Sequence, residues 1–262
     1  MATEPERGEV LLSAHELTVR YGGVTANDAI SIEIRGAEVV GLIGPNGAGK
    51  TTFIDAVSGF TKSKGEVRLE GRRIDSLAPH RRRRLGLART WQAGELFADL
   101  TAAQNLEVAC RGTVGLRTIL GDLVGRGRHG GAVEGALEAV GLSGYGERWP
   151  EDLSLGEQKL VGVARALAGE SRVLLLDEPA AGLDSNESLR LGMQLRKIAA
   201  GGIGILLVDH DMDLVMEICD RIYVLNFGHL ICEGSKTEVI ADEDVAAAYL
   251  GSPEPELHEA GS

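Results

Sequence analysis

The hydrophobic pattern divides the central part of the chain into short apolar runs that alternate with helix-compatible segments. Glu38–Ile43 (EVVGLI) is a run of strand length, and a glycine-rich turn and a helical stretch, Lys50–Gly59, follow it directly. Two further runs, Arg172–Leu176 and Ile203–Val208, each precede a polar segment that is compatible with a helix. Continuous apolar strands that alternate with helices are typical of a parallel sheet buried on both faces. The pattern therefore predicts an α/β fold with a parallel-sheet core.

A second pattern predicts another sheet beside this core. His15–Arg20, Ser31–Arg35 and Glu66–Glu70 alternate between apolar and polar residues, as half-exposed antiparallel strands do. Residues from about 100 to 150 lack strand signals, and we expect them to be helical. Within them, the glycine-rich stretch Gly121–Gly131 is typical of a flexible connector.

Composition narrows the class of protein. A length of 262 residues favours one domain. The 27 Lys and Arg and 39 Asp and Glu residues give a net charge of −12, which disfavours a nucleic-acid-binding protein. The three cysteines form no CxxC pair, which favours a reducing compartment over disulfides or a zinc site. The chain begins without a signal-peptide pattern, and no apolar run approaches the ~20 residues of a membrane-spanning helix. We therefore expect a soluble protein whose partners would do any membrane spanning.

A phosphate-binding loop is the strongest chemical signal. The segment GPNGAGKT fits the pattern GxxxxGK[ST] and lies between a predicted strand and a predicted helix, as that motif requires. Its glycines let successive backbone N–H groups point at phosphate oxygens, and the helix N-terminus adds positive charge. Lys50 should reach the β- and γ-phosphates and the Thr51 hydroxyl should bind Mg²⁺. A chance glycine-rich turn is the weaker alternative. The nucleotide-binding residues predicted here are Gly44, Pro45, Asn46, Gly47, Ala48, Gly49, Lys50, Thr51 and Thr52.

A pair of carboxylates ends the next apolar run, Val173–Leu176. Asp177 at the end of this strand would face the nucleotide crevice and hold Mg²⁺ through water. Glu178 is next in the chain and would polarise the attacking water as a general base. An acidic helix N-cap is the plainer explanation for the pair. The buried run before the two residues and Pro179 after them favour the metal and base roles.

These motifs, together with several others in order, resemble those of ATP-binding-cassette (ABC) ATPases over nearly the whole chain. Tyr21 resembles the aromatic residue that stacks on adenine, and Gln92 resembles the Q-loop glutamine. LSLGE at 153–157, with Ser154 and Gly156, resembles the signature motif. AGLD at 181–184, with Asp184, resembles the D-loop, and His210 resembles the switch histidine. The resemblance implies a P-loop NTPase fold with a RecA-like parallel-sheet core, an antiparallel β subdomain and a helical signature subdomain. Leu155 and Glu157 depart from the signature consensus.

The resemblance also implies roles for individual residues. Catalysis would involve Lys50, Gln92, Glu178 and His210, and Mg²⁺ would be held by Thr51, Gln92 and Asp177. Tyr21, Ser154, Gly156 and Asp184 would join the loop residues in binding ATP. Several of these residues have a plainer explanation when taken alone: Tyr21 as an exposed turn aromatic, His210 as a surface residue and Ser154 as a helix N-cap. Their common order and spacing favour the functional reading.

The subfamily is indicated by RTWQ at 89–92, EPAAGLD at 178–184, VDHDMDLVM at 208–216 and AAAYLG at 246–251. These segments resemble the ATPase subunits of branched-chain amino-acid importers. The resemblance implies a head-to-tail pair with a second ATPase subunit, identical or paralogous, two membrane permease subunits and an extracytoplasmic substrate-binding protein. It places the chain peripherally on the cytoplasmic side of the membrane, without nucleic acid. A related importer of urea or amides and a non-transport ABC ATPase are the alternatives.

The predicted domain organisation is simple. Residues 10–251 would form a single ABC ATPase domain, with the helical subdomain at about 95–168. Residues 1–9 and the acidic residues 252–262 would be flexible tails. One basic run, HRRRR at 80–84, stands out in an acidic chain. It fits equally well a contact with anionic headgroups or a permease and an ordinary solvated helix face.

Overall fold

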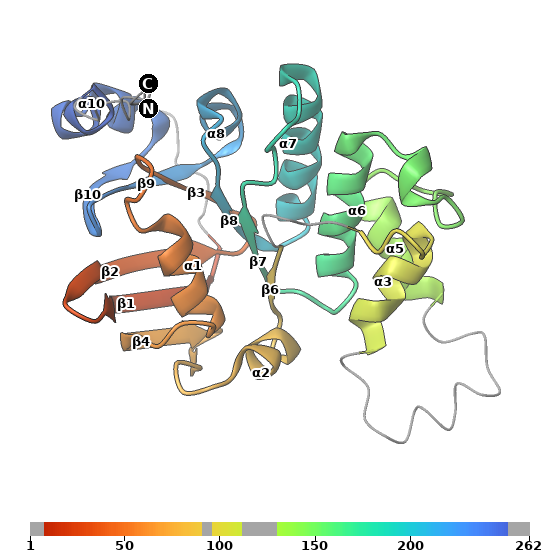
Figure 1. Cartoon of the computed structure of the whole chain (residues 1–262), viewed down its shortest axis with the longest axis horizontal. Coiled ribbons are helices and arrows are strands. Elements are labelled where there is room, and N and C mark those ends of the chain that lie inside the picture. Colours follow the sequence, from red (N-terminus) through yellow and green to blue (C-terminus); the bar gives the residue numbers. More distant parts are fainter. Residues whose placement is uncertain (1–7, 91–95, 112–129, 251–262) are drawn as a thin grey trace, which may run out of the picture.

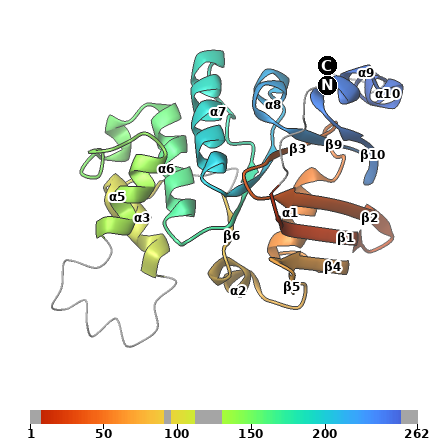
Figure 2. The same cartoon turned by 180° about the vertical axis from the view of Figure 1, so that it is seen from behind.

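The computed structural model describes residues 8–90, 96–111 and 130–250 (Figures 1 and 2). Gln92, most of the two predicted tails and most of the predicted connector lie outside these ranges. Within them, no helix combines the length and the hydrophobicity that crossing a membrane requires.

The predicted antiparallel sheet is present, with longer strands than the sequence pattern indicated. Its strands are ordered β2-β1-β4-β5, and neighbours pair antiparallel, as Leu12 with Ile34 and Ala14 with Val67. Apolar side chains such as these point into the core, whereas polar neighbours such as His15 and Arg68 are exposed. The strands are β1 (Val10–Tyr21), β2 (Val24–Arg35), β4 (Lys64–Leu69) and β5 (Arg72–Arg73).

The second sheet is the predicted parallel core. Its order is β10-β9-β3-β8-β7-β6, and all neighbours run parallel except β9 and β10. The three apolar runs of the sequence form the adjacent strands β3, β8 and β7, whereas the strands that flank them were not predicted. The strands are β3 (Val39–Ile43), β6 (Leu87–Arg89), β7 (Val173–Asp177), β8 (Gly204–Val208), β9 (Arg221–Asn226) and β10 (His229–Gly234).

Both faces of the parallel sheet are buried, because alternate strand residues enter two different cores. Val40 and Leu42 pack with α1 (Lys50–Ser58) and the antiparallel sheet. Val39 and Ile43 pack with the helices of the opposite face. Those helices are α6 (Leu155–Leu167), α7 (Ser185–Ala200) and α8 (Met212–Ile218). Helices α1 and α6 therefore lie on opposite sides of the sheet (Figures 1 and 2).

The remaining helices lie at the ends of the molecule. α3 (Ala102–Arg111) and α5 (Gly130–Ala139) pack on α6, so that this part of the region predicted to be helical is helical. α9 (Lys236–Ala241) and α10 (Glu243–Leu250) lie beside β10 (Figure 1). A 3-10 turn, Pro150–Asp152, precedes α6.

The basic run forms α2 (Pro79–Arg84), and two of its arginines are structural. The Arg82 guanidinium is buried and donates to the carbonyls of Ala56 and Val57 at the end of α1 and to those of Asp75 and Leu77. The half-buried guanidinium of Arg83 donates to two carbonyls at the end of α6 and just beyond it, Ala166 and Gly169. Cationic side chains satisfy carbonyls that a helix end leaves unpaired. Neither interpretation of the run from the sequence describes these two residues. Of its four arginines, only Arg81 and Arg84 are exposed.

Candidate nucleotide site

The parallel register brings three loops to one edge of the sheet. Asp177 pairs with Val208 and Gly41 pairs with Leu207, so β3, β7 and β8 end at similar heights. The phosphate-loop motif, Glu178 and His210 follow directly or closely after these three ends. Ligands in open α/β sheets bind outside the carboxyl ends of the strands. The candidate site is therefore this edge, where motifs far apart in the sequence meet.

The phosphate loop is held from outside by neighbouring backbone. Gly44 has φ +147°, and a Cβ at this position would lie 2.1 Å from the carbonyl oxygen of Leu225. Gly49 has φ +103° and is the N-cap of α1, and its carbonyl accepts a hydrogen bond of 3.1 Å from the side-chain amide of Asn27. The amide of Gly228 donates to the Ala48 carbonyl at 3.0 Å. Only glycine fits at position 44, which gives a steric reason for the first glycine of the phosphate-loop motif.

Lys50 places its charge inside the loop. Its Nζ donates to the carbonyls of Gly44 at 2.7 Å and Pro45 at 3.0 Å. Burial lowers the pKa of Lys50, and the nearby carboxylates of Glu178 and Asp177 oppose this shift. An ammonium held at this place, beside the helix N-terminus, is suited to binding a phosphate chain.

Asp177 is a buried carboxylate with one oxygen engaged and one oxygen unsatisfied. It is 2% exposed, and burial raises its pKa, an effect that the Arg89 guanidinium opposes. Arg89 Nη2 lies 3.1 Å from Oδ2 of Asp177. Oδ1 has no hydrogen-bond partner among the described residues. Such an oxygen, near the hydroxyl-bearing first turn of α1, fits Mg²⁺, which prefers hard oxygen ligands from one or two side chains plus phosphates.

A buried carboxylate joins the segments of Glu178 and His210. Glu178 has φ +49° and its amide donates to the Val208 carbonyl at 2.7 Å. Asp209 Oδ2 accepts from the Ala180 amide at 3.0 Å, and its Oδ1 lies 3.7 Å from Nδ1 of the exposed His210. The turn that carries the candidate base and the turn that carries the candidate switch histidine therefore share one support.

The signature serine, Ser154, lies at the start of α6 and not in the loops at this edge of the sheet. Ser154 is the N-cap of α6, and its hydroxyl accepts from the Glu157 amide at 3.2 Å while the Glu157 carboxylate accepts from the Ser154 amide at 2.8 Å. This capping box gives Glu157, one of the two departures from the consensus, a local structural reason. The other, Leu155, is exposed and lies against the D-loop, because a Cβ on Gly182 would come within 3.3 Å of its Cδ2. Helix α6 packs with α3, α5 and α7, whereas α1 packs against the antiparallel sheet, so Ser154 and the phosphate loop of one chain lie in different parts of the molecule (Figure 1).

The other predicted residues have less enclosed positions. Tyr21 ends β1 with 52% of its surface exposed, and its hydroxyl is 3.2 Å from that of Thr61. Asp184 is the N-cap of α7, where Oδ1 accepts from the amides of Asn186 and Glu187. Gln92 lies outside the described residues.

Three supporting residues escaped the sequence reasoning: Asn27, Arg89 and Asp209. Each is buried or nearly so, and each contacts a motif residue or the turn beside it. Arg89 and Asp209 lie in RTWQ and VDHDMDLVM, segments that indicated only the subfamily, and Asn27 lies outside the strand patterns of the sequence. A buried polar residue requires a partner, but the sequence does not say which partner.

A glycine substitution tests the loop geometry. We expect Gly44→Ala to lower the free energy of unfolding by about 1–3 kcal/mol, because its Cβ would overlap the Leu225 carbonyl. Gly47→Ala is the matched control: Gly47 also has a positive φ, +79°, but open space where its Cβ would lie. Urea unfolding of both variants measures the difference. Equal losses for the two would show that close packing on Leu225 does not constrain the loop.

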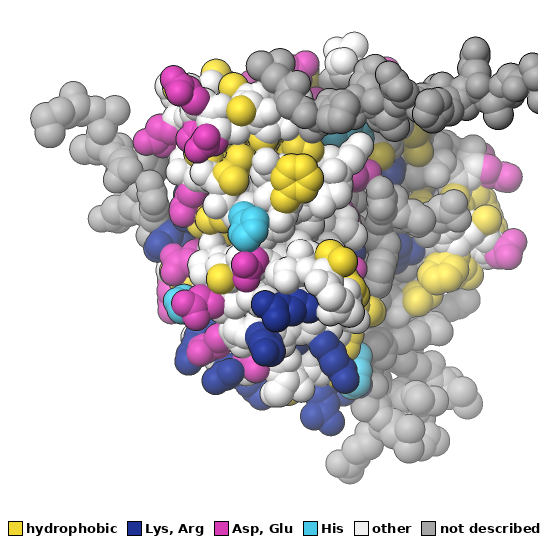
Figure 3. Space-filling model, turned by 60° about the vertical axis from the view of Figure 1, so that its left-hand side comes forward, with side chains coloured by type: hydrophobic (Ala, Val, Ile, Leu, Met, Phe, Trp, Pro, Cys, Tyr) yellow, Lys and Arg dark blue, Asp and Glu magenta, His cyan; other side chains and the backbone are white. Residues whose placement is uncertain are grey.

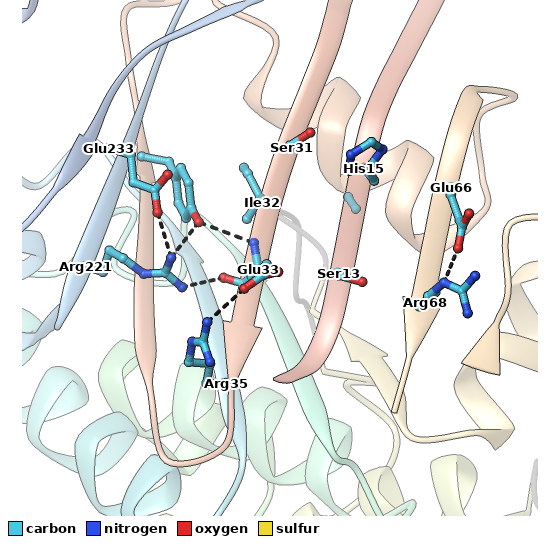
Figure 4. A pocket seen from close by; sticks show the side chains of 12 residues that line it. Ser13, His15, Ser31, Ile32, Glu33, Arg35, Glu66, Arg68, Arg221 and Glu233 are labelled. Atoms are coloured by element: carbon cyan, nitrogen blue, oxygen red, sulfur yellow. Dashed lines mark hydrogen bonds and ion pairs between the residues drawn. The ribbon is translucent and has the colours of Figure 1, made fainter. Parts of the chain in front are cut away.

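A hollow of about 680 Å³ lies away from this edge, between the outer face of the antiparallel sheet and the β9–β10 hairpin (Figure 4). Its charged side chains pair with one another. Arg221 bonds to Glu233, Glu38 and the Tyr223 hydroxyl, and Arg35 pairs with Glu33. No predicted site residue lines this hollow. Nε of Arg35 is buried without a hydrogen-bond partner among the described residues, but the ion pairs occupy most of the charged groups, and the candidate site remains at the strand ends.

Comparison with known proteins agrees with this geometry. Residues 27–181 match the model of the family described as "ABC transporter". The chain is 37% identical to the high-affinity branched-chain amino acid transport ATP-binding protein LivG of Salmonella typhimurium, over 92% of this chain and 98% of LivG. It is 36% identical to the corresponding protein BraF of Pseudomonas aeruginosa, with the same coverage. A nucleotide-free ATP-binding cassette from an ABC transporter shares the fold, with a TM-score of 0.80, 28% identity, and 93% of this chain and 100% of that chain covered. The chain belongs to the ABC transporter family.

Proposed function

We propose that this protein is the ATP-binding and ATP-hydrolysing subunit of an ABC importer for branched-chain or other hydrophobic amino acids. The observation that carries the proposal is the meeting of Lys50, Asp177 and Glu178 at one edge of the parallel sheet. A phosphate-binding loop, a buried carboxylate and an adjacent carboxylate are the parts that magnesium-dependent hydrolysis of a triphosphate requires.

The residues at this edge have separate tasks. The N–H groups of residues 44–51 and the Lys50 ammonium bind the phosphates, and Thr51 and Asp177 hold Mg²⁺. When bound, Mg²⁺ neutralises charge on the phosphate oxygens. The Glu178 carboxylate accepts a proton from the water that attacks the γ-phosphorus. His210 would contact the γ-phosphate, and the Asp209 support keeps it in register with Glu178.

A second ATPase subunit would complete each site. Because α6 packs with α3, α5 and α7 and not beside α1, we propose that its N-terminal N–H groups and Ser154 meet a γ-phosphate that is bound to another copy or a paralogue. Charge supports a head-to-tail pair. Basic residues outnumber acidic ones in residues 8–90, whereas acidic residues are more than twice as frequent as basic ones in residues 130–250. Figure 3 shows Lys and Arg side chains mainly in the lower part of one face, with Asp and Glu predominating above them.

A permease contact is supported by a hollow of about 440 Å³ beside β6. Half-exposed Phe60 and the apolar residues Pro79 and Leu87 line it, together with His80 and Arg83. The hollow lies next to the strand that leads into the segment of Gln92, the residue expected to couple nucleotide to the membrane partner. We propose that this hollow contacts one of two permease subunits. By analogy with the importers of LivG and BraF, the ATPase would lie on the cytoplasmic side of the membrane and an extracytoplasmic binding protein would deliver the substrate.

The substrate is proposed from the names of the relatives LivG and BraF, because an amino acid would pass through the permeases and would not bind at the nucleotide site. An importer of urea or amides is the second candidate. Reconstituting the chain with its permeases and binding protein in proteoliposomes, and comparing ATP-dependent uptake of radiolabelled leucine and urea, distinguishes them. Uptake of neither would favour a cassette that serves no importer of this kind.

The nucleotide site is tested by Lys50→Ala. We expect the affinity for Mg²⁺-ATP to fall at least about tenfold, because one charge-assisted contact with phosphate contributes roughly 1.5–3 kcal/mol. Isothermal titration calorimetry measures the affinity. The control is Lys62→Ala, which removes an exposed lysine in the neighbouring loop. Unchanged affinity in Lys50→Ala would contradict the proposed site.

A further inference from the structure

Arg89 joins three elements of the nucleotide site. It is the last residue of the edge strand β6, and its side chain is 7% exposed. Its Nη1 pairs with Asp55 and lies 3.3 Å from the Ser58 hydroxyl, both on α1, and its Nη2 pairs with Asp177 on β7. One guanidinium therefore connects the helix that follows the phosphate loop to the strand that ends in Asp177.

The pairing is asymmetric at Asp177. Arg89 engages Oδ2, while Oδ1 is buried without a hydrogen-bond partner among the described residues. Leaving a buried carboxylate oxygen unsatisfied is costly, so such an oxygen in a native protein is normally explained by a catalytic role, a bound ion or a water. The guanidinium thus fixes the rotation of the carboxylate and determines which oxygen remains for the ligand.

We propose that Arg89 is a positioning residue for Mg²⁺. It holds the Asp177 carboxylate by Oδ2 so that Oδ1 faces the metal, and it balances the buried charge of Asp177 and the partly exposed charge of Asp55. The inference deepens the proposed function and rests on the proposed Mg²⁺-ATP site. The planar fork of an arginine can hold two carboxylates in fixed directions, whereas a lysine ammonium would supply charge without that geometry.

Arg89 also lines the hollow beside β6, where Phe60 lies with its ring centroid 5.9 Å from the guanidinium carbon. One face of the side chain is therefore directed to the surface and the other to Asp177. A group that packs into the hollow and displaces Phe60 would disturb the same guanidinium that orients the metal ligand.

The test compares nucleotide affinity with and without the metal. In the full-length protein, ATP binding is titrated in Mg²⁺ and in EDTA, and the ratio of the two affinities is the readout. We expect Arg89→Gln to reduce this ratio about tenfold, with little change in EDTA, since loss of a partner that orients a metal ligand weakens metal binding by roughly 10–100-fold. Arg89→Lys should lie between Arg89→Gln and the wild type.

Arg83→Gln is the matched control. Arg83 lines the same hollow and is half-buried, but its guanidinium donates to the Ala166 and Gly169 carbonyls. We expect its affinity ratio to equal that of the wild type. A wild-type ratio in folded Arg89→Gln would overturn the inference, whereas a wild-type protein without any Mg²⁺-dependent ATP binding would overturn the proposed function instead.

A second variant keeps the inference testable if Arg89→Gln does not fold, which thermal unfolding would reveal. Asp55→Asn weakens the other anchor of the guanidinium and leaves Arg89 and Asp177 in place. We expect the affinity ratio to fall in the same direction and by a smaller factor. An unchanged ratio in this folded variant would then overturn the positioning role.

Discussion

Replacing Glu178 by Gln is expected to lower the rate of ATP hydrolysis at least about 100-fold, because the amide cannot accept the proton of the attacking water. The affinity for ATP should change less than about twofold, because the amide keeps the shape of the side chain. Glu178 directly follows the buried carboxylate Asp177, and its backbone is anchored to Val208. Phosphate release measures turnover and calorimetry measures affinity. With hydrolysis blocked, we also expect ATP to retain the closed pair of subunits, which size-exclusion chromatography detects.

The control for this experiment is Glu170→Gln. Glu170 is exposed, lies away from the site and has a backbone conformation similar to that of Glu178, with φ +58° against +49°. Glu170→Gln therefore makes the same chemical change in the same backbone conformation. We expect wild-type turnover from it. Wild-type turnover from Glu178→Gln as well would exclude Glu178 as the general base.

Removing the buried guanidinium of Arg82 is expected to produce the largest loss of stability. Arg82→Ala leaves the carbonyls of Ala56 and Val57 at the end of α1, and those of Asp75 and Leu77, without this donor. Hydrogen bonds to charged groups contribute roughly 1.5–3 kcal/mol each, and the bonds of one side chain are not additive, so we expect a loss of about 3 kcal/mol. In a domain of this size that lowers the melting temperature by roughly 6–12 °C.

Arg81→Ala separates this structural effect from the loss of one positive charge. Arg81 precedes Arg82 in α2 and is exposed, so its removal should change stability by no more than about 0.5 kcal/mol. Thermal unfolding of both variants provides the comparison. Similar melting temperatures for the two would show that the carbonyls around Arg82 find other donors.

The parallel core and the antiparallel sheet could be predicted because their signals are local. The runs that became β3, β7 and β8 are apolar throughout, and β1 and β2 alternate. The strand β6 has only three residues, too few for a periodicity to be recognised. β9 has the composition of a buried strand and lies next to β3, so its apolar residues are a local signal from which this strand is predictable.

The basic run shows where charge patterns mislead. Four consecutive arginines indicate an exposed cationic surface, but a helix of this length turns successive residues in different directions. Arg82 and Arg83 consequently point inward, where they bind carbonyls of α1 and of the segment around the end of α6. The sequence does not show which elements pack beside α2, so it could not predict that these guanidinium groups donate to carbonyls near the ends of α1 and α6.

The amino-acid sequence by itself determined the groups that would contact phosphate, metal and water, because a glycine-rich loop, a strand-terminal Asp177 and the adjacent Glu178 are short segments whose backbone geometry follows from local sterics. Tertiary structure alone decided how those groups are held. Asn27, Arg89 and Asp209 act on partners 22, 88 and 29 residues away, and such pairings depend on strand order and on the two buried faces of the sheet. Tertiary packing also separates Ser154 from Lys50, because α6 packs with α3, α5 and α7, whereas α1 packs against the antiparallel sheet.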